Sequence, residues 1–329
     1  MRAIIIEEYG DAENFALKDI PIPTVAPGTV LLRVKGTSVN PVDLLTRSMG
    51  APLAPDLPAI LHSDVAGIVE RVSDDVTSFE VGDEVYGCVG GVAGTPGTLA
   101  EYVLADANLL ARKPATADMM SAAALPLVSI TAWQAVFERA RIEPGQKILV
   151  FGGSGGVGHI VIQLAKHVGA HVVATASSDA KRRIALECGA DDVVNYKELP
   201  IESIVQDHSR GAGFDVVIDT VGGGNLANAF QATKMGGEVV TTVALGQVDL
   251  SQAHMRALSL HVVFMLIPLL HGVGRADHGK ILSEIAGLVD AGKLKPVIDP
   301  SRFTMDQVAQ AHELMESGAH VGKIVLMQN

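Results

Sequence analysis

The most informative segment of the chain is KILVFGGSGGVGHIVIQLAKHVGAHVVATAS, residues 147–177. An apolar run ends at Phe151, and Gly153, Gly155 and Gly158 then fit the pattern G-x-G-x-x-G. The pattern alone is weakly specific. Here it follows a buried strand, opens an amphipathic helix and leads to a second apolar strand within about 30 residues. The stretch therefore predicts a βαβ unit that binds a dinucleotide.

The glycines of this loop have a physical role in such a site. Residues without a side chain let the backbone turn tightly and approach a pyrophosphate, and the helix behind them offers free N–H groups and the positive end of its dipole. The alternative interpretation is a flexible loop that happens to be rich in glycine. We expect the cofactor to contact the whole loop, namely Gly153, Ser154, Gly155, Gly156, Val157 and Gly158.

The end of the second strand indicates which dinucleotide is bound. Sites selective for NAD place an acidic residue there, about 20 residues past the loop, to bind the ribose 2′-hydroxyl. This chain has Ser177 and Ser178, followed by Lys181, and such groups suit the 2′-phosphate of NADPH. Asp179 is the exception, and its position predicts the N-cap of the next helix. We therefore expect NADPH rather than NADH; the alternative for the basic run 181–183 is a solvated helix face.

After Leu125 the sequence alternates between continuous apolar runs and amphipathic segments. Continuous apolar runs without alternation are typical of parallel strands that helices cover on both faces, and amphipathic segments lie between these runs. This order predicts a doubly wound α/β domain. The apolar runs are residues 147–151, 171–176, 191–194, 214–219 and 238–242.

The regions before and after this predicted α/β domain have a different residue pattern. Short β-like runs separated by turns rich in proline and glycine fill about the first 120 residues. They predict an antiparallel, barrel-like domain. The C-terminal segment 320–329 is again strand-like, and we expect it to return to this domain.

The composition limits the class of protein. With 329 residues, 48% of them hydrophobic and 19% charged, the chain suits a globular protein of about two domains. A net charge of −12 and the lack of a basic run argue against nucleic acid or an anionic membrane as partner. Two cysteines argue against a disulfide framework. The most hydrophobic run, 258–274, is interrupted by Pro268, so we expect a buried strand and helix there, and a cytoplasmic protein.

Four further motifs accompany the glycine loop. They are GTSVNPVDLLTR (36–47), HSDVAGIVERV (62–72), VGDEVYG (81–87) and AAALPLVSITAW (122–133). With them the chain resembles the medium-chain dehydrogenase/reductase superfamily, and within it the zinc-independent quinone oxidoreductase branch. The resemblance runs from the N-terminus to the terminal GKIVL. It implies a homodimer with a GroES-like catalytic domain of residues 1–124 and 267–329 and a Rossmann NADP-binding domain of residues 125–266.

The same resemblance bears on a metal. Alcohol dehydrogenases of this superfamily hold a catalytic zinc with a Cys, a His and a second Cys, and alignment of the motifs places Asn40, Ser63 and Leu127 at those positions. His62 falls one residue before the ligand position. An amide, a hydroxyl and an isobutyl group do not form the ligand set of a catalytic zinc. We therefore expect no zinc.

A site without a metal favours an activated acceptor. Nothing then lowers the pKa of an alcohol hydroxyl, whereas hydride transfer to a quinone or an α,β-unsaturated carbonyl needs only hydrogen-bond donors for the charge on oxygen. We expect an enzyme, a NADPH-dependent reductase of such a small molecule. The alternatives are an alcohol dehydrogenase-type oxidoreductase and a NADPH-binding sensor or structural protein with little turnover.

The catalytic candidates are Asn40, Asp43, Arg47 and His62. Asn40 is expected to donate to a substrate carbonyl, and Arg47 either to donate as well or to pair with Asp43. The alternative for Asn40 and Asp43 is a pair of turn residues around Pro41. His62 is either a proton donor that acts after hydride transfer or a buried histidine with satisfied hydrogen bonds.

The resemblance also implies further cofactor contacts. Thr131 is expected beside the nicotinamide or its phosphates, the alternative being a threonine inside a helix. Lys181 and Tyr196 are expected at the 2′-phosphate. Asp219, Val243 and Ala244 are expected to line the other side of the cofactor, and the alternative for Asp219 is a turn residue at a strand end.

Three further expectations concern less specific signals. Tyr86 is a candidate for a tyrosine donor or a core residue. Residues 261–275 form either a substrate-side loop or the edge of a dimer. His159, His167 and His171 are expected at the surface.

Overall fold

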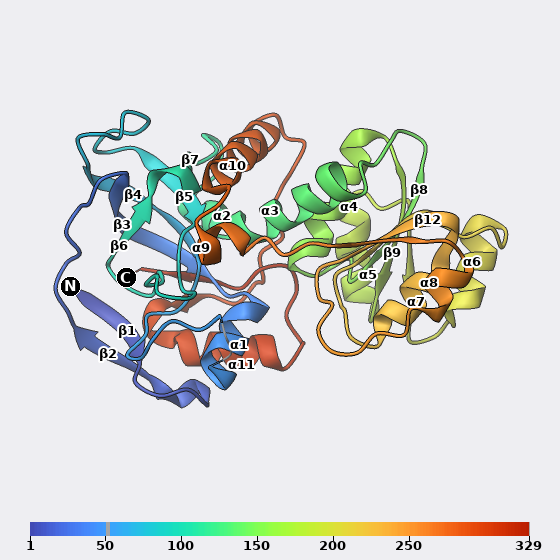
Figure 1. Ribbon diagram of the computed structural model, residues 1–329, viewed down its shortest axis with the longest axis horizontal. Coiled ribbons are helices and arrows are strands. Elements are labelled where there is room, and N and C mark those ends of the chain that lie inside the picture. Colours follow the sequence, from blue (N-terminus) through green and yellow to red (C-terminus); the bar gives the residue numbers. More distant parts are fainter. Residues whose placement is uncertain (51–52, 329) are drawn as a thin grey trace. The chain divides into compact units, whose positions relative to one another are not determined.

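A mainly antiparallel sheet forms the first part of the structure. The computed structural model describes residues 1–50 and 53–328. The sheet has the order β14-β15-β3-β4-β5-β7, β6 pairs with β3, and β1 and β2 form a separate hairpin (Figure 1). These strands are β1 (Arg2–Ile6), β2 (Phe15–Asp19), β3 (Thr29–Ser38), β4 (Asp64–Val72), β5 (Glu84–Cys88), β6 (Tyr102–Asp106), β7 (Leu110–Arg112), β14 (Phe303–Thr304) and β15 (Val325–Met327).

The long strand β3 is the centre of this sheet. It pairs antiparallel with β4, with β6 and with β15 from the C-terminal end of the chain. The expected return of the C-terminal segment to the first domain is therefore confirmed. The accompanying helices are α1 (Pro41–Met49), α2 (Met119–Ala123), α9 (Ile267–His271), α10 (Arg275–Asp290) and α11 (Val308–Glu316), with 3-10 turns at Ala12–Asn14, Ala107–Leu109 and Met305–Gln307.

A parallel sheet forms the second part. Its order is β10-β9-β8-β11-β12-β13, which is the strand order of a dinucleotide-binding fold, with the first strand next to the fourth. Helices α4 and α5 pack together, as do α6 with α7 and α7 with α8. The strands are β8 (Lys147–Phe151), β9 (His171–Ala176), β10 (Asp192–Asn195), β11 (Phe214–Asp219), β12 (Thr233–Thr241) and β13 (Ser259–Val262). The helices are α4 (Gly156–Val168), α5 (Asp179–Glu187), α6 (Ile201–Ser209), α7 (Asn225–Ala232) and α8 (Ser251–Met255), preceded by α3 (Pro126–Trp133) and a π-helical segment, Gln134–Arg139.

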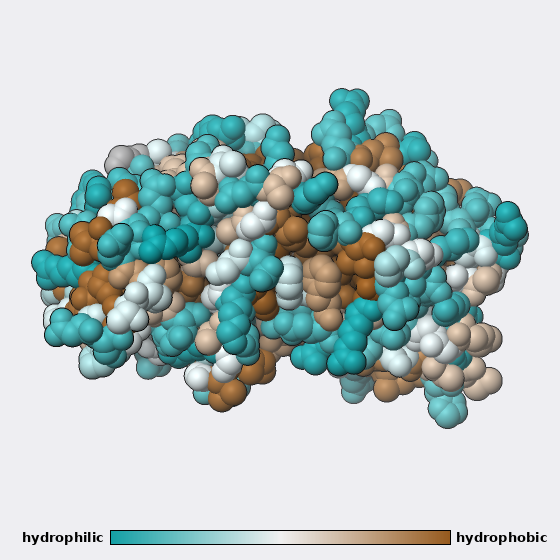
Figure 2. Space-filling view, turned by 90° about the horizontal axis from the view of Figure 1, so that it is seen from above, coloured by the Kyte–Doolittle hydropathy of each residue, from teal (hydrophilic) through white to brown (hydrophobic). Residues whose placement is uncertain are grey.

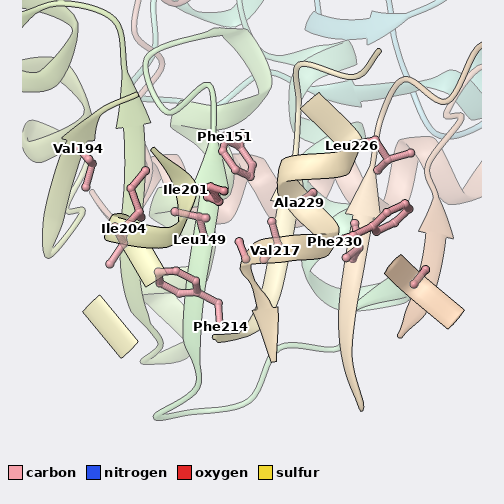
Figure 3. Close-up of a cluster of buried hydrophobic side chains, with 14 residues drawn as sticks. Leu149, Phe151, Val194, Ile201, Ile204, Phe214, Val217, Leu226, Ala229 and Phe230 are labelled. Atoms are coloured by element: carbon pink, nitrogen blue, oxygen red, sulfur yellow. The ribbon is translucent and has the colours of Figure 1, made fainter. Parts of the chain in front are cut away.

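A cluster of buried apolar side chains joins this parallel sheet to its helices. Phe214 at the start of β11 and Phe230 on α7 are among the largest fully buried side chains. They pack with Leu149 of β8, Val217 of β11 and Leu226 of α7 (Figure 3). The strands β8, β9 and β11 are buried along most of their length, as expected for strands covered on both faces.

The described chain divides into two compact units. Unit 1 comprises Met1–Ile130, Leu266–Gly292 and Ile298–Asn329, and unit 2 comprises Thr131–Met265 and Lys293–Val297. The fold class predicted from the sequence, an antiparallel barrel-type domain with a doubly wound parallel-sheet domain, is confirmed.

Two local predictions are wrong. The N-cap of α5 is Ser178, whose hydroxyl accepts from the backbone of Lys181, and Asp179 is the first residue of the helix. His159, expected at the surface, is fully buried. Its imidazole Nδ1 lies 2.9 Å from the carbonyl of Gly155 at the start of α4. Its place in the first turn directs the ring toward the loop rather than toward solvent.

The surface is mixed in character. Figure 2 shows apolar residues in patches between hydrophilic ones on the face it presents. Over residues 1–50 and 53–328, none of the helices combines the length and the apolar character that crossing a membrane requires.

Candidate functional site

The glycine loop of unit 2 folds as a tight turn between β8 and α4. Gly152 has a φ of +78°, and the backbone N–H of Gly153 donates to the carbonyl of Thr175 at 3.0 Å. A Cβ on Gly158 would lie 2.1 Å from the carbonyl oxygen of Gly152, and one on Gly153 would lie 2.8 Å from the Cβ of Ala174. The predicted glycines are therefore required for the helix to approach the strands so closely.

The N-terminus of α4 is open for an anion. Gly155 is the N-cap and, having no side chain, cannot accept a hydrogen bond from the first N–H groups of the helix in place of a ligand. The first N–H groups of a helix have no partner within the helix, so those of Gly156, Val157 and Gly158 suit phosphate oxygens. Ser154, next to them, is mostly buried. The loop can hold the pyrophosphate of a dinucleotide.

The residues predicted at the 2′-phosphate lie together in unit 2. β9 and β10 pair in parallel with Asn195 opposite Ala176, so Ser177, Ser178 and Tyr196 follow neighbouring strand ends. The N–H of Tyr196 donates to the carbonyl of Ala176 at 3.3 Å, and its side chain is 51% exposed. Ser177 and Ser178 occupy the strand end at which NAD-selective sites place an acid. A 2′-phosphate is therefore not repelled by a carboxylate at that position itself.

A small cavity adjoins this strand end. Its volume is about 230 Å³. Its polar lining includes Ser178 and Arg182, but also the acidic side chains of Asp179, Asp192 and Glu198. Lys181, which the sequence singles out, is not part of the lining, whereas Arg182 is. Arg182 also lies 3.8 Å from Asp192. The assignment of Lys181 to the 2′-phosphate stays a prediction.

The remaining cofactor candidates in unit 2 meet at the carboxyl edge of the sheet. β8, β11 and β12 are neighbours, so Asp219 at the end of β11 lies between the glycine loop and the segment after β12. A Cβ on Gly222 would lie 2.5 Å from the Cβ of Val243, which packs on the turn after β11. Val243 and Ala244 therefore border the edge at which ligands of such sheets bind.

Asp219 organises this turn. Its buried carboxylate accepts from the backbone of Val221 at 3.0 Å, from Gly222 at 3.1 Å and from the amide of Asn225 at 2.8 Å. These bonds agree with the alternative interpretation of Asp219 as a turn residue. A cofactor contact by its carboxylate would have to compete with them.

In unit 1 the polar candidates form a buried cluster. Asn40 is fully buried; its amide nitrogen donates to Asp64 Oδ2 at 2.8 Å, and its oxygen accepts from Lys323. Asp43 accepts from the backbone of Asn40 at 2.7 Å, as the first turn of α1 requires for its cap. Asp64 and Lys323 are not among the sequence candidates.

The charges of this cluster affect one another. Burial raises the pKa of Asp43 to about 8, an effect that the backbone hydrogen bond from Asn40 opposes and the charge of Asp64 reinforces. Burial lowers the pKa of Lys323, while the nearby carboxylates of Asp64 and Asp43 raise it. The cluster therefore holds a lysine between two acids in an interior without solvent.

Arg47 does not pair with Asp43. Its guanidinium is buried, donates to the carbonyl of Gly10 at 2.8 Å and forms an ion pair with Glu316 of α11. Of the two alternatives for Arg47, the pair with Asp43 is wrong, because residues four apart on α1 meet only when both side chains turn the same way, and Asp43 turns back to cap the helix.

His62 lies in a buried pair of imidazoles. Its Nε2 is 2.9 Å from Nε2 of His312 on α11, and its Nδ1 is 3.4 Å from the hydroxyl of Thr37. Burial, together with His312 and Lys323, lowers the pKa of His62 well below its usual value. These contacts agree with the interpretation of His62 as a buried histidine with satisfied hydrogen bonds.

Two other candidates lie within regular elements. Tyr86 is fully buried, and its hydroxyl donates to the carbonyl of Leu282 at 2.6 Å, so it is a core residue. Thr131 is the first residue of unit 2 and lies within α3. Residues 261–275 contain the end of β13, the helix α9 and the start of α10.

The residues at the aligned zinc positions do not fit that metal. The Asn40 amide is bound to Asp64 and Lys323, and Leu127 contributes its backbone N–H to Asp64 at 2.8 Å. Over residues 1–50 and 53–328, no three His, Cys, Asp or Glu side chains are placed to hold a metal ion. The donor set is thus that of a charged hydrogen-bond cluster and not of a catalytic zinc.

Two residues of this cluster carry sequence signals that the motif alignment does not use. Asp64 stands next to Ser63 in the motif that aligns with the zinc ligands, and Lys323 is a charged residue in the otherwise apolar GKIVL. An ionisable residue within an apolar sequence that is expected to form a buried strand indicates that its charge has a buried partner. His312 gives no comparable signal.

Comparisons with known proteins agree with this geometry. Residues 26–115 match the family model of the alcohol dehydrogenase GroES-like domain, and residues 188–326 match that described as zinc-binding dehydrogenase. The chain is 33% identical to the quinone oxidoreductase of Rattus norvegicus over 99% of this chain and 98% of that protein. It is 34% identical to the chloroplastic NADPH-dependent alkenal/one oxidoreductase of Arabidopsis thaliana, over 99% of this chain and 79% of the relative.

A solved structure extends the agreement to the fold. The crystal structure of an alcohol dehydrogenase superfamily protein from Novosphingobium aromaticivorans is 37% identical, with a TM-score of 0.95 and full coverage of both chains. The glycine loop, the sheet order and these relatives lead to one conclusion. The chain is an oxidoreductase that belongs to the medium-chain dehydrogenase/reductase superfamily, in its quinone oxidoreductase-like branch.

Proposed function

We propose that this protein is a NADPH-dependent reductase that transfers hydride to a quinone or an α,β-unsaturated carbonyl without zinc. The observation that carries the proposal is the end of β9, where Ser177 and Ser178 stand at the position that selects the dinucleotide. The similarity to a quinone oxidoreductase and to a NADPH-dependent alkenal/one oxidoreductase supports this choice of cofactor and acceptor.

The cofactor supplies the hydride, and one further proton completes the reduction of a quinone to the hydroquinone or of an enone to the saturated carbonyl. The chain itself has to bind the cofactor, orient it toward the acceptor and enclose the two. The N–H groups at the start of α4 hold the phosphates, and Ser177, Ser178 and Arg182 bind the 2′-phosphate.

Unit 1 supplies a rigid polar interior. Asn40, Asp43, Arg47 and His62 are all buried with partners inside the unit, so we propose that they shape the substrate side by fixing the turn before α1 and the start of β4. Whether His62 also releases a proton after hydride transfer is a separate prediction, which a pH profile of kcat tests.

The test of the function is NADPH oxidation against a panel of quinones, enones and enoyl thioesters, repeated with NADH. We expect turnover with at least one quinone or enone and a preference for NADPH. Failure with every acceptor would contradict the reductase assignment, and a preference for NADH would contradict the role of Ser177 and Ser178. Stoichiometric zinc in the purified protein, with oxidation of simple alcohols, would favour the alcohol dehydrogenase alternative.

We also propose a homodimer in the cytoplasm. β13 is the last strand of the parallel sheet, so one side of it offers unpaired backbone groups. Val262 at the end of this strand and Phe264 just after it are substantially exposed. Light scattering is expected to give twice the chain mass, and Val262→Lys to give the monomer. Cell fractionation tests the location, which the acidic composition and the two cysteines support.

A further inference from the structure

We infer that Lys323 is a positioning residue: its ammonium holds the side chain of Asn40 and, through Asp64, the first turn of α3. Only the kinetic consequence of this inference rests on the proposed function. The anchoring itself is a property of unit 1 and can be measured without turnover.

Lys323 is a buried cation with defined partners. The residue is 1% exposed, and its Nζ donates to the carbonyl of Val39 at 2.9 Å and to Oδ1 of Asn40. Oδ2 of Asp64 lies 3.5 Å from the same Nζ. An ammonium in an interior is tolerated only when carboxylates and carbonyls replace its lost hydration. These contacts therefore fix both the lysine and its partners.

Asp64 connects the lysine cluster to the first turn of α3. Its Oδ2 accepts from Ser38 at 2.6 Å and from Asn40 at 2.8 Å, and its Oδ1 accepts from the backbone N–H of Leu127 at 2.8 Å. Leu127 is the second residue of α3, where the N–H groups have no partner within the helix. A carboxylate at this position binds the helix terminus and interacts favourably with its dipole.

The cluster joins segments that are far apart in the sequence. Asn40 and Lys323 are separated by 283 positions, and Asp64 and Leu127 by 63. The ionisable groups that face Lys323 are Asp64, Asp43, the thiol of Cys88 and the imidazole of His62. Removal of the ammonium leaves Asp64 as a buried carboxylate without its counter-charge, and Asn40 loses the donor that sets which way its amide points.

Loss of Lys323 is expected to affect the reaction by displacing α3. Thr131, the candidate for a cofactor contact, lies four residues after Leu127, about one helical turn. A misplacement of about 1 Å in a site of this kind can lower the rate about 100-fold. We therefore expect loss of Lys323 to act mainly on kcat. Binding of NADPH is expected to change little, because the glycine loop belongs to unit 2.

The experiment compares Lys323→Met, Asp64→Asn and the double variant with the wild-type protein. Methionine keeps the length of the side chain and removes the charge, and the double variant also removes the uncompensated carboxylate. Lys280→Met is the matched control, because the Lys280 side chain is 76% exposed and pairs only at the surface with Asp277 at 3.2 Å. The measurements are Tm, the Kd of NADPH, kcat and KM for the acceptor, and amide hydrogen exchange of peptides covering 119–133.

For Lys323→Met we expect faster exchange at the start of α3 and kcat lowered about 10- to 100-fold, while the Kd of NADPH stays within about threefold. The double variant should regain Tm and part of the α3 protection, because the amide oxygen introduced by Asp64→Asn still accepts from Leu127, but its kcat should stay low. Lys280→Met should match the wild type in every measurement.

Two results would overturn the inference. One is a folded Lys323→Met with unchanged exchange at α3 and unchanged kcat. The other is full recovery of kcat in the double variant, which would mean that Lys323 only neutralises Asp64. If the wild type reduces no acceptor while exchange at α3 still rises in Lys323→Met, the proposed function fails and the anchoring stands.

Discussion

His62 and His312 form a stacked pair of imidazoles in the core of unit 1, with ring centroids 5.2 Å apart and Nε2 atoms 2.9 Å apart. One ring must donate and the other accept, so the two rings cannot both be protonated. Burial lowers the pKa of each ring and keeps both neutral in the folded protein at neutral pH. Phe15 meets the ring of His312 edge-on, at a centroid distance of 5.0 Å, and closes the cluster. The pair has consequences for stability that can be measured.

The first prediction concerns acid. Burial lowers the pKa of His312 to about 3, and that of His62 lies well below its usual value. Above a pH of about 6.5 both histidines are neutral in the folded and the unfolded chain, so they cause no pH dependence there. Below it the unfolded chain takes up protons that the folded chain does not bind, and the free energy of unfolding falls by about 1.4 kcal/mol per pH unit for each histidine.

Urea unfolding of the wild type and of His312→Phe between about pH 4 and 8 tests this prediction. The variant should show a shallower loss of stability below the usual pKa of histidine. Parallel curves for the two proteins would contradict the account of the pair.

The second prediction concerns the backbone of His62. This residue has a φ of +71°, in the left-handed region that favours glycine. His62→Gly should therefore be more stable than His62→Ala by about 1–2 kcal/mol, although both lose the buried ring. The order should reverse at His312 inside α11, where glycine is about 1 kcal/mol worse than alanine. Thermal unfolding of the four variants gives both differences, and equal stability of the two His62 variants would contradict the prediction.

The third prediction concerns the glycine loop. A Cβ on Gly158 would meet the carbonyl oxygen of Gly152 at 2.1 Å, so Gly158→Ala must displace the loop or the helix. We expect the affinity for NADPH to fall at least about 10-fold, as measured by quenching of protein fluorescence. Gly287→Ala in α10 is the matched control, since a Cβ there meets nothing within 4 Å, and it should bind NADPH normally. Normal binding by Gly158→Ala would contradict the assignment of the loop.

The fourth prediction concerns the choice of cofactor. Ser178 caps α5, and both Asp and Asn are good N-cap residues, so Ser178→Asp and Ser178→Asn keep the helix. Only the aspartate adds a charge that repels a 2′-phosphate. We expect Ser178→Asp to weaken NADPH binding about 10- to 100-fold with little effect on NADH, and Ser178→Asn to change the ratio far less. An equal effect of both substitutions on NADPH would mean that charge at this strand end does not select the cofactor.

The fifth prediction concerns Asp43. Burial raises its pKa from 3.8 to about 8, so between these values the folded chain keeps a proton that the unfolded chain releases. This carboxyl therefore lowers stability increasingly as the pH rises through that window. Asp43→Asn can still accept from the backbone of Asn40, and its gain in unfolding free energy over the wild type should be larger at about pH 8 than at about pH 5.

Chemical unfolding at the two pH values measures this gain. Asp277→Asn, at an exposed position on α10, is the control and should show little change at either pH. A gain of Asp43→Asn that is the same at both pH values would show that the carboxyl does not hold its proton.

Much of unit 2 could be predicted from the sequence. The glycine loop, the buried strands and the helices between them are local patterns of a few to about 30 residues, and their period reports the backbone conformation directly. For the same reason the end of β9 can be located from the sequence, although the predicted cap of α5 lies one residue too late. The role of the residues there in selecting the cofactor stays a prediction.

The candidate site in unit 1 was only partly predictable. The motifs indicate that Asn40, Asp43 and the segment from His62 lie near one another, but they do not reveal that Asp64 and Lys323 hold them. Nor do they reveal the true partner of the Arg47 guanidinium, which lies on α11. No local pattern marks a partner far along the chain, and His62 and His312 are separated by 250 positions.

Local patterns in the sequence are enough to predict the fold class and the glycine loop, and the residue types at Asn40, Ser63 and Leu127 are enough to argue against a zinc ligand set. Which buried charge faces which becomes visible only in the folded chain. Buried ions lose their hydration and must find partners within about 4 Å, and those distances exist only after strands from the two ends of the chain have paired into one sheet.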